Sequence, residues 1–209
     1  GAWHWRVLRK GLDACQRPAW AAFLAALVLT ACGSALFHAR PDTDTITLDR
    51  LPIAWACSAL LCAFLAERVN ARWGRRTVLA GGITLATAAA LLWWWGEHQG
   101  GPGDLRAYLA VQLLPMLLIP IGLVLGLARP ALGTPLRDAA WWWALGLYAL
   151  AKLVEALDAP LLYVSGSISG HTLKHLLAAA AAAVLVHGAL HAARRHSASL
   201  KRGDAPAAG

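Results

Sequence analysis

Long runs of apolar residues constrain this chain more than any other feature of its sequence. Hydrophobic residues make up 58% of it and charged residues only 14%. The apolar residues form blocks of about 20, the length that a helix needs to cross a bilayer core of roughly 30 Å. Because backbone groups in lipid must be hydrogen-bonded within their own segment, we predict that these blocks are helices. The predicted protein is an all-α integral membrane protein with six transmembrane helices, at about 18–38, 51–67, 77–95, 107–128, 139–160 and 170–193.

The positions of lysine and arginine predict how these helices are oriented. Fourteen basic residues lie in the N-terminal stretch, in the loops after the second and fourth helices, and at the C-terminus, whereas three lie in the loops after the first and third helices. Basic residues gather on the cytoplasmic side of membrane proteins, so both ends of the chain are expected in the cytoplasm. We predict one transmembrane domain over residues 1–196 and a disordered cytoplasmic tail over 197–209.

The net charge of +8 is therefore explained by the membrane topology and does not by itself indicate a charged partner. No basic cluster is combined with an aromatic surface on which bases could stack, so a nucleic-acid partner is not expected. The solvent of this chain is the lipid bilayer.

Five side chains that can carry chemistry lie at helix ends on the extracytoplasmic side of this topology. Ser34 and His38 close the first helix, Asp49 precedes the second, and His171 and His175 open the last one. Polar and ionisable groups in membrane segments are costly and usually functional. Three helix ends from distant parts of the sequence are thus predicted to bring these groups to one membrane depth.

The spacing of the histidines predicts a metal site. His171 and His175 are four residues apart, so their rings project from one face of a helix. Three imidazoles with a fourth position left to water are typical of catalytic zinc, which lowers the pKa of that water. Asp49 could then accept the proton of the water as a general base, and Ser34 could hydrogen-bond the water or a developing oxyanion.

A second pair, His187 and His191, repeats this spacing at the other end of the last helix. No other predicted site residue lies at the same membrane depth as this pair. We therefore interpret it as an interfacial pair that does not bind the metal. The chain therefore contains its own control for the first pair.

Charged residues of the last two helices are expected beside the histidines. Lys152, Glu155 and Asp158 follow one another at spacings of three near the end of the fifth helix, and Lys174 lies on the same face as His171 and His175. One interpretation is an ion-pair cluster in which Glu155 or Asp158 neutralises Lys174. The other is that a carboxylate orients a ligand histidine by accepting its other ring proton.

The motifs together resemble a known family. They are Ser-x-x-x-His at 34–38, Leu-Asp-Arg-Leu-Pro at 48–52, and Ser-Gly-His-Thr-Leu-Lys-His-Leu at 169–176. In this order they resemble the alkaline ceramidases and their bacterial phytoceramidase-like relatives. These belong to the CREST superfamily of membrane hydrolases, which also includes the adiponectin-receptor-like proteins. The resemblance extends over nearly the whole chain.

The resemblance implies a seven-helix CREST fold of which this chain has six helices; the missing first helix would lie upstream of Gly1, so either the chain is an N-terminally shortened form or it works with six helices. It implies zinc bound by His38, His171 and His175, and an amidohydrolase that cleaves a ceramide-like lipid amide to a sphingoid base and a fatty acid. A bacterial inner membrane is the implied location, with a membrane lipid as the substrate and the bilayer as the surroundings. The acidic N-terminal segment by which the eukaryotic ceramidases bind calcium is not present in this sequence, so no calcium is predicted.

Two other functions fit parts of the pattern. A metal-binding receptor of the adiponectin-receptor-like kind would share the histidines but hydrolyse little, and Leu-Asp-Arg-Leu-Pro favours the ceramidase side. A haem protein would place one histidine from each of two helices on the iron. An absorption spectrum of the pure protein separates the haem alternative from the other two.

The predicted topology can be tested by thiol labelling. In a chain whose four native cysteines are replaced, Ser167→Cys should react with a membrane-impermeant reagent on intact cells, because residue 167 lies in an extracytoplasmic loop. Asn70→Cys, in a basic loop, should react only after permeabilisation. Labelling of Ser167→Cys only after lysis would invert the topology.

Overall fold

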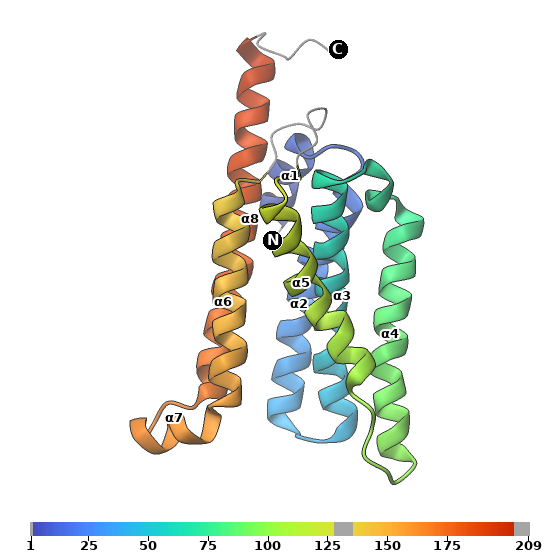
Figure 1. The fold of residues 1–209 in the computed structure, drawn as a ribbon, viewed down its shortest axis with the longest axis vertical. Coiled ribbons are helices and arrows are strands. Elements are labelled where there is room, and N and C mark those ends of the chain that lie inside the picture. The colour runs from blue at the N-terminus through green and yellow to red at the C-terminus, as the bar shows by residue number, and fades with distance from the viewer. Residues whose placement is uncertain (1, 128–135, 203–209) are drawn as a thin grey trace. The chain divides into compact units, whose positions relative to one another are not determined.

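The computed structural model describes residues 2–127 and 136–202, and every regular element in these ranges is a helix. The chain falls into two compact units, one of residues 1–11 with 133–209 and one of residues 12–132, where the sequence predicts a single domain over 1–196. The elements, drawn in Figure 1, are α1 (Ala2–Gly11), α2 (Arg17–Ala39), α3 (Thr43–Arg68), the 3₁₀ turn η1 (Ala71–Gly74), α4 (Arg76–His98), α5 (Arg106–Val124), α6 (Asp138–Ala156), α7 (Asp158–Ser165) and α8 (Gly170–Arg202).

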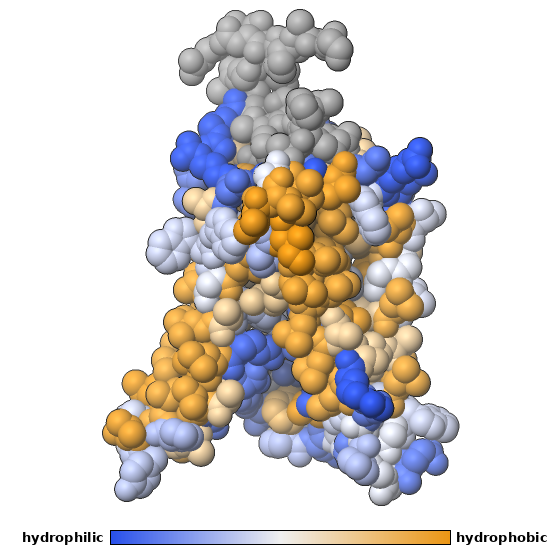
Figure 2. All heavy atoms as spheres, viewed as in Figure 1, coloured by the Kyte–Doolittle hydropathy of each residue, from blue (hydrophilic) through white to orange (hydrophobic). Residues whose placement is uncertain are grey.

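Five of the described helices are long and apolar enough to cross a membrane, namely α2, α3, α4, α5 and α8. Figure 2 shows this character on α5, whose visible surface is largely hydrophobic. The remaining predicted span corresponds to α6, in which three tryptophans, Lys152 and Glu155 lower the mean hydropathy. The described residues are thus all helical and include five candidate membrane spans, as an all-α membrane protein requires, and the sixth span stays a prediction.

The largest difference from the prediction is the start of α3. The helix begins at Thr43 and not near residue 51, because Asp42 and Thr45 form a capping box. The Asp42 carboxylate accepts the Thr45 N–H at 2.8 Å, and Thr45 Oγ1 accepts the Asp42 N–H at 3.1 Å. The Thr45 bonds also lower the pKa of Asp42 below its ordinary value. Asp49 is consequently inside a helix, and its predicted place before the start of the second helix is wrong.

Other boundaries differ at prolines and helix ends. The helix predicted over 139–160 is divided at Leu157, and Pro160 lies in the first turn of α7, where a missing N–H is tolerated. At the other end of the unit, α8 continues to Arg202, so residues 197–202 are helical where a disordered tail was expected, and 203–209 lie outside the described residues. Neither α1 nor η1 is among the predicted helices.

In the first unit α6 and α8 run side by side, and α1 packs against α8 (Figure 1). Small residues allow these approaches, since a Cβ at Gly188 would lie 3.2 Å from the Cβ of Ala140, and one at Gly11 would overlap Ala193. Small residues at helix contacts let backbones approach closely where lipid gives no hydrophobic driving force between helices.

In the second unit α3 is the central helix and contacts α2, α4 and α5. Polar side chains link it to α4: the Trp55 indole N–H donates to Thr87 Oγ1 at 2.8 Å, and Ser58 Oγ donates to the Gly82 carbonyl at 3.3 Å. Such bonds satisfy polar groups within the helix bundle, where water is scarce.

A close backbone contact in this unit joins α2 and α3, which form an antiparallel hairpin (Figure 1). A Cβ on Gly33 would overlap the Leu48 carbonyl and lie 3.0 Å from the Asp49 Cα. Pro52 is four residues after Leu48 and has no N–H to give to that carbonyl. The Leu48 carbonyl, which Pro52 leaves without its usual helical donor, thus faces Gly33, the glycine of α2.

This contact predicts a specific sensitivity of the fold. Gly33→Ala should lower the stability of the purified protein by about 1–3 kcal/mol, because the new methyl group meets backbone atoms that cannot rotate away. Gly81→Ala on α4 is the matched control, since nothing lies within 4 Å of its Cβ position. Thermal unfolding in detergent measures both variants. Equal unfolding midpoints would show that α2 and α3 can move apart without loss of stability.

Candidate metal centre

The α2–α3 hairpin brings together three of the predicted site residues. Ser34 directly follows Gly33, the residue in contact with the backbone of Leu48 and Asp49, and His38 is one helical turn further along α2. Ser34 and Asp49 are partly buried, and His38 is exposed. The hairpin therefore places a hydroxyl and a carboxylate at the same level of two neighbouring helices, with an imidazole one turn closer to the connecting loop.

Arg50 fixes the rotation of α3 about its axis at this level. Its guanidinium carbon lies 3.9 Å from the ring centroid of Trp93 on α4 and 5.7 Å from that of Tyr108 on α5. A guanidinium over an aromatic face is attracted by the ring quadrupole, more strongly where water is excluded. Consecutive residues of a helix point about 100° apart, so Asp49 points away from this anchor, and its Cα lies at the contact with Gly33 of α2.

The other two histidines stand on the first two turns of α8, whose start is held by two caps. The Ser169 hydroxyl accepts the N–H of Thr172 at 3.1 Å, and the Asp158 carboxylate accepts the N–H of His171 at 2.7 Å. These bonds satisfy two of the four amides that a helix start leaves without partners. A Cβ on Gly170 would overlap the Val154 carbonyl, so the start of α8 packs directly on the end of α6.

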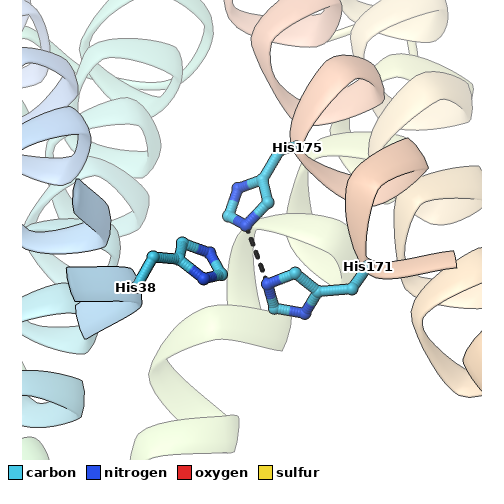
Figure 3. Close-up of side chains that lie close together, drawn as sticks. All are labelled: His38, His171 and His175. Carbon is cyan, nitrogen blue, oxygen red and sulfur yellow. Dashed lines mark hydrogen bonds between the residues drawn. The ribbon is translucent and has the colours of Figure 1, made fainter. Parts of the chain in front are cut away.

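His171 and His175 face each other across one turn of α8 (Figure 3). Their Nε2 atoms are 3.0 Å apart, and the two rings meet edge to face at 73°. Two nitrogens on one tetrahedral zinc, each at 2.0–2.1 Å from it, are separated by about 3.3 Å. The pair therefore needs only a small adjustment to become two ligands of one ion.

The second pair shows that this local geometry does not identify the ligands by itself. His187 and His191 have their Nε2 atoms 2.9 Å apart and their rings at 72°. The two pairs differ in their surroundings, since the first is partly buried beside the capped helix start and the second is exposed.

His38 completes a set of three imidazoles that could hold a metal ion, and Figure 3 draws its members. No other such set of three or more His, Cys, Asp or Glu residues occurs in the described part of the chain. His38 belongs to the second unit and the pair to the first, so a single ion shared by all three is a proposal about how the units assemble.

The charged residues near the pair have partners that the sequence predicts only in part. The predicted ion-pair cluster is confirmed for Lys174, whose ammonium lies 2.9 Å from a Glu155 oxygen, and Lys152 bonds the other oxygen at 2.9 Å. Asp158 acts on the backbone of His171, which orients the helix that carries the ring. A role of Glu155 or Asp158 in directing an imidazole proton stays a prediction.

No family model, curated protein or solved structure matches this chain. The interpretation of the site rests on its own residues and their geometry.

Sequence reasoning missed the residues that position the site. Gly33 directly precedes Ser34, Ser169 and Gly170 are the two residues before His171, and Arg50 is adjacent to Asp49. A glycine or a serine one or two positions before a polar residue at a helix end was the available signal, because those types mark close approaches and caps.

The contrast between the two histidine pairs gives a metal-binding prediction. His171→Ala should reduce zinc from about one ion per chain to near zero, because one imidazole of the pair is lost, whereas His187→Ala should retain it. Elemental analysis of protein purified without a metal-affinity tag measures both. Equal zinc in the two variants would refute this choice of ligands.

Proposed function

We propose that this chain is a zinc-dependent membrane hydrolase that cleaves the amide bond of a ceramide-like lipid to a long-chain base and a fatty acid. The observation that carries the proposal is the pair of facing Nε2 atoms of His171 and His175 on the capped start of α8. His38 is the third ligand, and Asp49 and Ser34 act on the reacting groups. The motif resemblance to the alkaline ceramidases supports the same assignment.

The donors fit zinc better than calcium or magnesium. Imidazole nitrogens suit zinc, whereas calcium and magnesium prefer oxygen ligands. Three protein ligands leave one position of a tetrahedron open, which is typical of catalytic zinc sites. When bound, zinc supplies Lewis-acid chemistry, lowering the pKa of a water and polarising a carbonyl oxygen.

Asp49 and Ser34 have different roles in the proposed reaction. The Asp49 carboxylate accepts a proton from the attacking water, whose oxygen forms a bond to the amide carbon. The Ser34 hydroxyl donates a hydrogen bond to the carbonyl oxygen as negative charge develops on it. The C–N bond then breaks, and the proton held by Asp49 passes to the leaving nitrogen, so that the products are a carboxylic acid and an amine.

The surroundings of these residues support a lipid substrate. Ser34, His38 and Asp49 belong to two helices that are apolar enough to span a membrane, and α8 is a third. Leucines on α2 and α3, among them Leu36 and Leu48, are exposed close to the polar residues. An amide carried by a long acyl chain can reach such residues from the lipid phase, where its chain stays in contact with apolar side chains.

Three variants separate metal binding from catalysis on the same purified samples. His38→Ala should lose zinc if one ion joins the two units. Asp49→Asn should keep zinc and the fold while turnover of a lipid amide falls by roughly 10²–10⁴, because the amide cannot accept the proton. Ser34→Ala should keep zinc, with a smaller loss of turnover.

Zinc content and turnover are the two measurements. Near-normal turnover of Asp49→Asn would remove Asp49 from the mechanism, and loss of zinc in that variant would make it a ligand or a structural residue. Full zinc in His38→Ala would end the proposal of a shared ion.

A further inference from the structure

Two lysines share one carboxylate next to the histidine pair. Lys152 Nζ lies 2.9 Å from Glu155 Oε2, and Lys174 Nζ lies 2.9 Å from Glu155 Oε1. We name these three residues the Lys-Glu-Lys cluster. Two ammonium groups against one carboxylate leave the cluster with one positive charge in excess.

No other carboxylate among the described residues lies within ion-pair distance of either ammonium group. Asp158 is the nearest acid in sequence, but its carboxylate accepts the N–H of His171 at the positive end of α8. The excess charge therefore remains at the cluster, on helices α6 and α8 of one compact unit.

The ammonium groups also have donors left over. An ammonium carries three N–H donors, and each of the two lysines uses one of them, on Glu155. Two donors remain on each lysine, enough for both oxygens of a carboxylate or two oxygens of a phosphate. With 35% of the Lys152 side chain and 20% of the Lys174 side chain exposed, a ligand can reach them.

The neighbouring side chains favour a ligand with an apolar tail. Leu153 directly follows Lys152 on α6, Leu157 is the residue after the end of that helix, and Leu176 is two residues after Lys174 on α8; all three are exposed. An unbalanced ammonium group in a membrane-spanning segment is costly. An anion attached to a hydrocarbon chain would satisfy both the charge and the apolar surface.

We propose that Lys152 and Lys174 bind the acidic headgroup of a lipid, and that the substrate is accordingly an N-acyl amide that carries a carboxylate or a phosphate. The substrate part rests on the proposed function, since Lys174 directly precedes His175 on α8. The binding part does not, because it needs neither zinc nor hydrolysis.

A matched pair of amphiphiles tests the proposal. N-lauroylglycine and N-lauroylethanolamine share the acyl chain and the amide and differ in one carboxylate. Binding is measured by calorimetry on the full chain in a non-ionic detergent, after zinc has been removed with a chelator. We expect at least tenfold tighter binding of N-lauroylglycine, and equal binding of the two would overturn the proposal.

A third ligand distinguishes the two kinds of headgroup. Dodecyl phosphate binding more tightly than N-lauroylglycine identifies a phosphate site, and the reverse order identifies a carboxylate site. Either order supports an acidic headgroup, because in both the neutral amide binds most weakly.

Single lysine variants test the cluster without leaving a charge unpaired. Lys152→Met leaves the Lys174–Glu155 pair neutral, and Lys174→Met leaves the Lys152–Glu155 pair neutral, so both should fold. Each should reduce the preference for N-lauroylglycine to within about twofold. The control is Arg9→Met, which removes one exposed positive charge on α1 and should keep the preference.

Glu155→Gln tests whether the lysine variants act through charge or through a general loss of packing between α6 and α8. It raises the excess at the cluster to two positive charges, so the preference for N-lauroylglycine should increase, opposite in sign to the lysine variants. A preference that survives in both lysine variants would overturn the proposal. Retained binding with no hydrolysis of any lipid amide would instead refute the proposed function and leave the headgroup site standing.

Discussion

The structure depends on how polar groups are satisfied within helices built for lipid. Backbone groups are bonded inside each helix, and polar side chains bond one another or a backbone group of a helix. Trp55 with Thr87 joins two helices in this way, and Asp158 with His171 joins a helix end to its neighbour. The candidate site residues stand where polar groups are hardest to satisfy, at a helix start and at a close helix contact. Their positions are thus consequences of the same constraint that forms the helices.

Most of the fold was predictable because apolar periodicity and length have one solution in a bilayer. Five predicted spans correspond to long apolar helices, and the end of α2 agrees to within one residue. The start of α3 was not predicted, because Asp42, Thr43, Asp44 and Thr45 have loop-like composition while their side chains form a cap. The break after α6 was likewise hidden, since Leu157 lies in a continuous apolar stretch and Pro160 acts from three residues beyond.

The site was predictable to a different extent in its two halves. Helical spacing alone brings His171 opposite His175, so their contact follows from the sequence. The same rule produces the contact of His187 with His191, and spacing cannot rank the two pairs. The sharing of Glu155 between two lysines depends on the rotation of α6 against α8, which no pattern within one helix encodes. Sequence thus identifies candidate ligands, and helix packing decides which charges accompany them.

Gly33 and Pro52 have a consequence for how this sequence can diverge. The proline leaves the Leu48 carbonyl without an intrahelical partner, and the glycine provides room for a backbone against that carbonyl. Neither residue is a neutral site while the other is present. A substitution of Pro52 that restores an N–H would let the Leu48 carbonyl accept a hydrogen bond within α3. Glycine at position 33 would then be less strictly required. The two positions should therefore change together among descendants of this chain, as one inherited character spread over two helices.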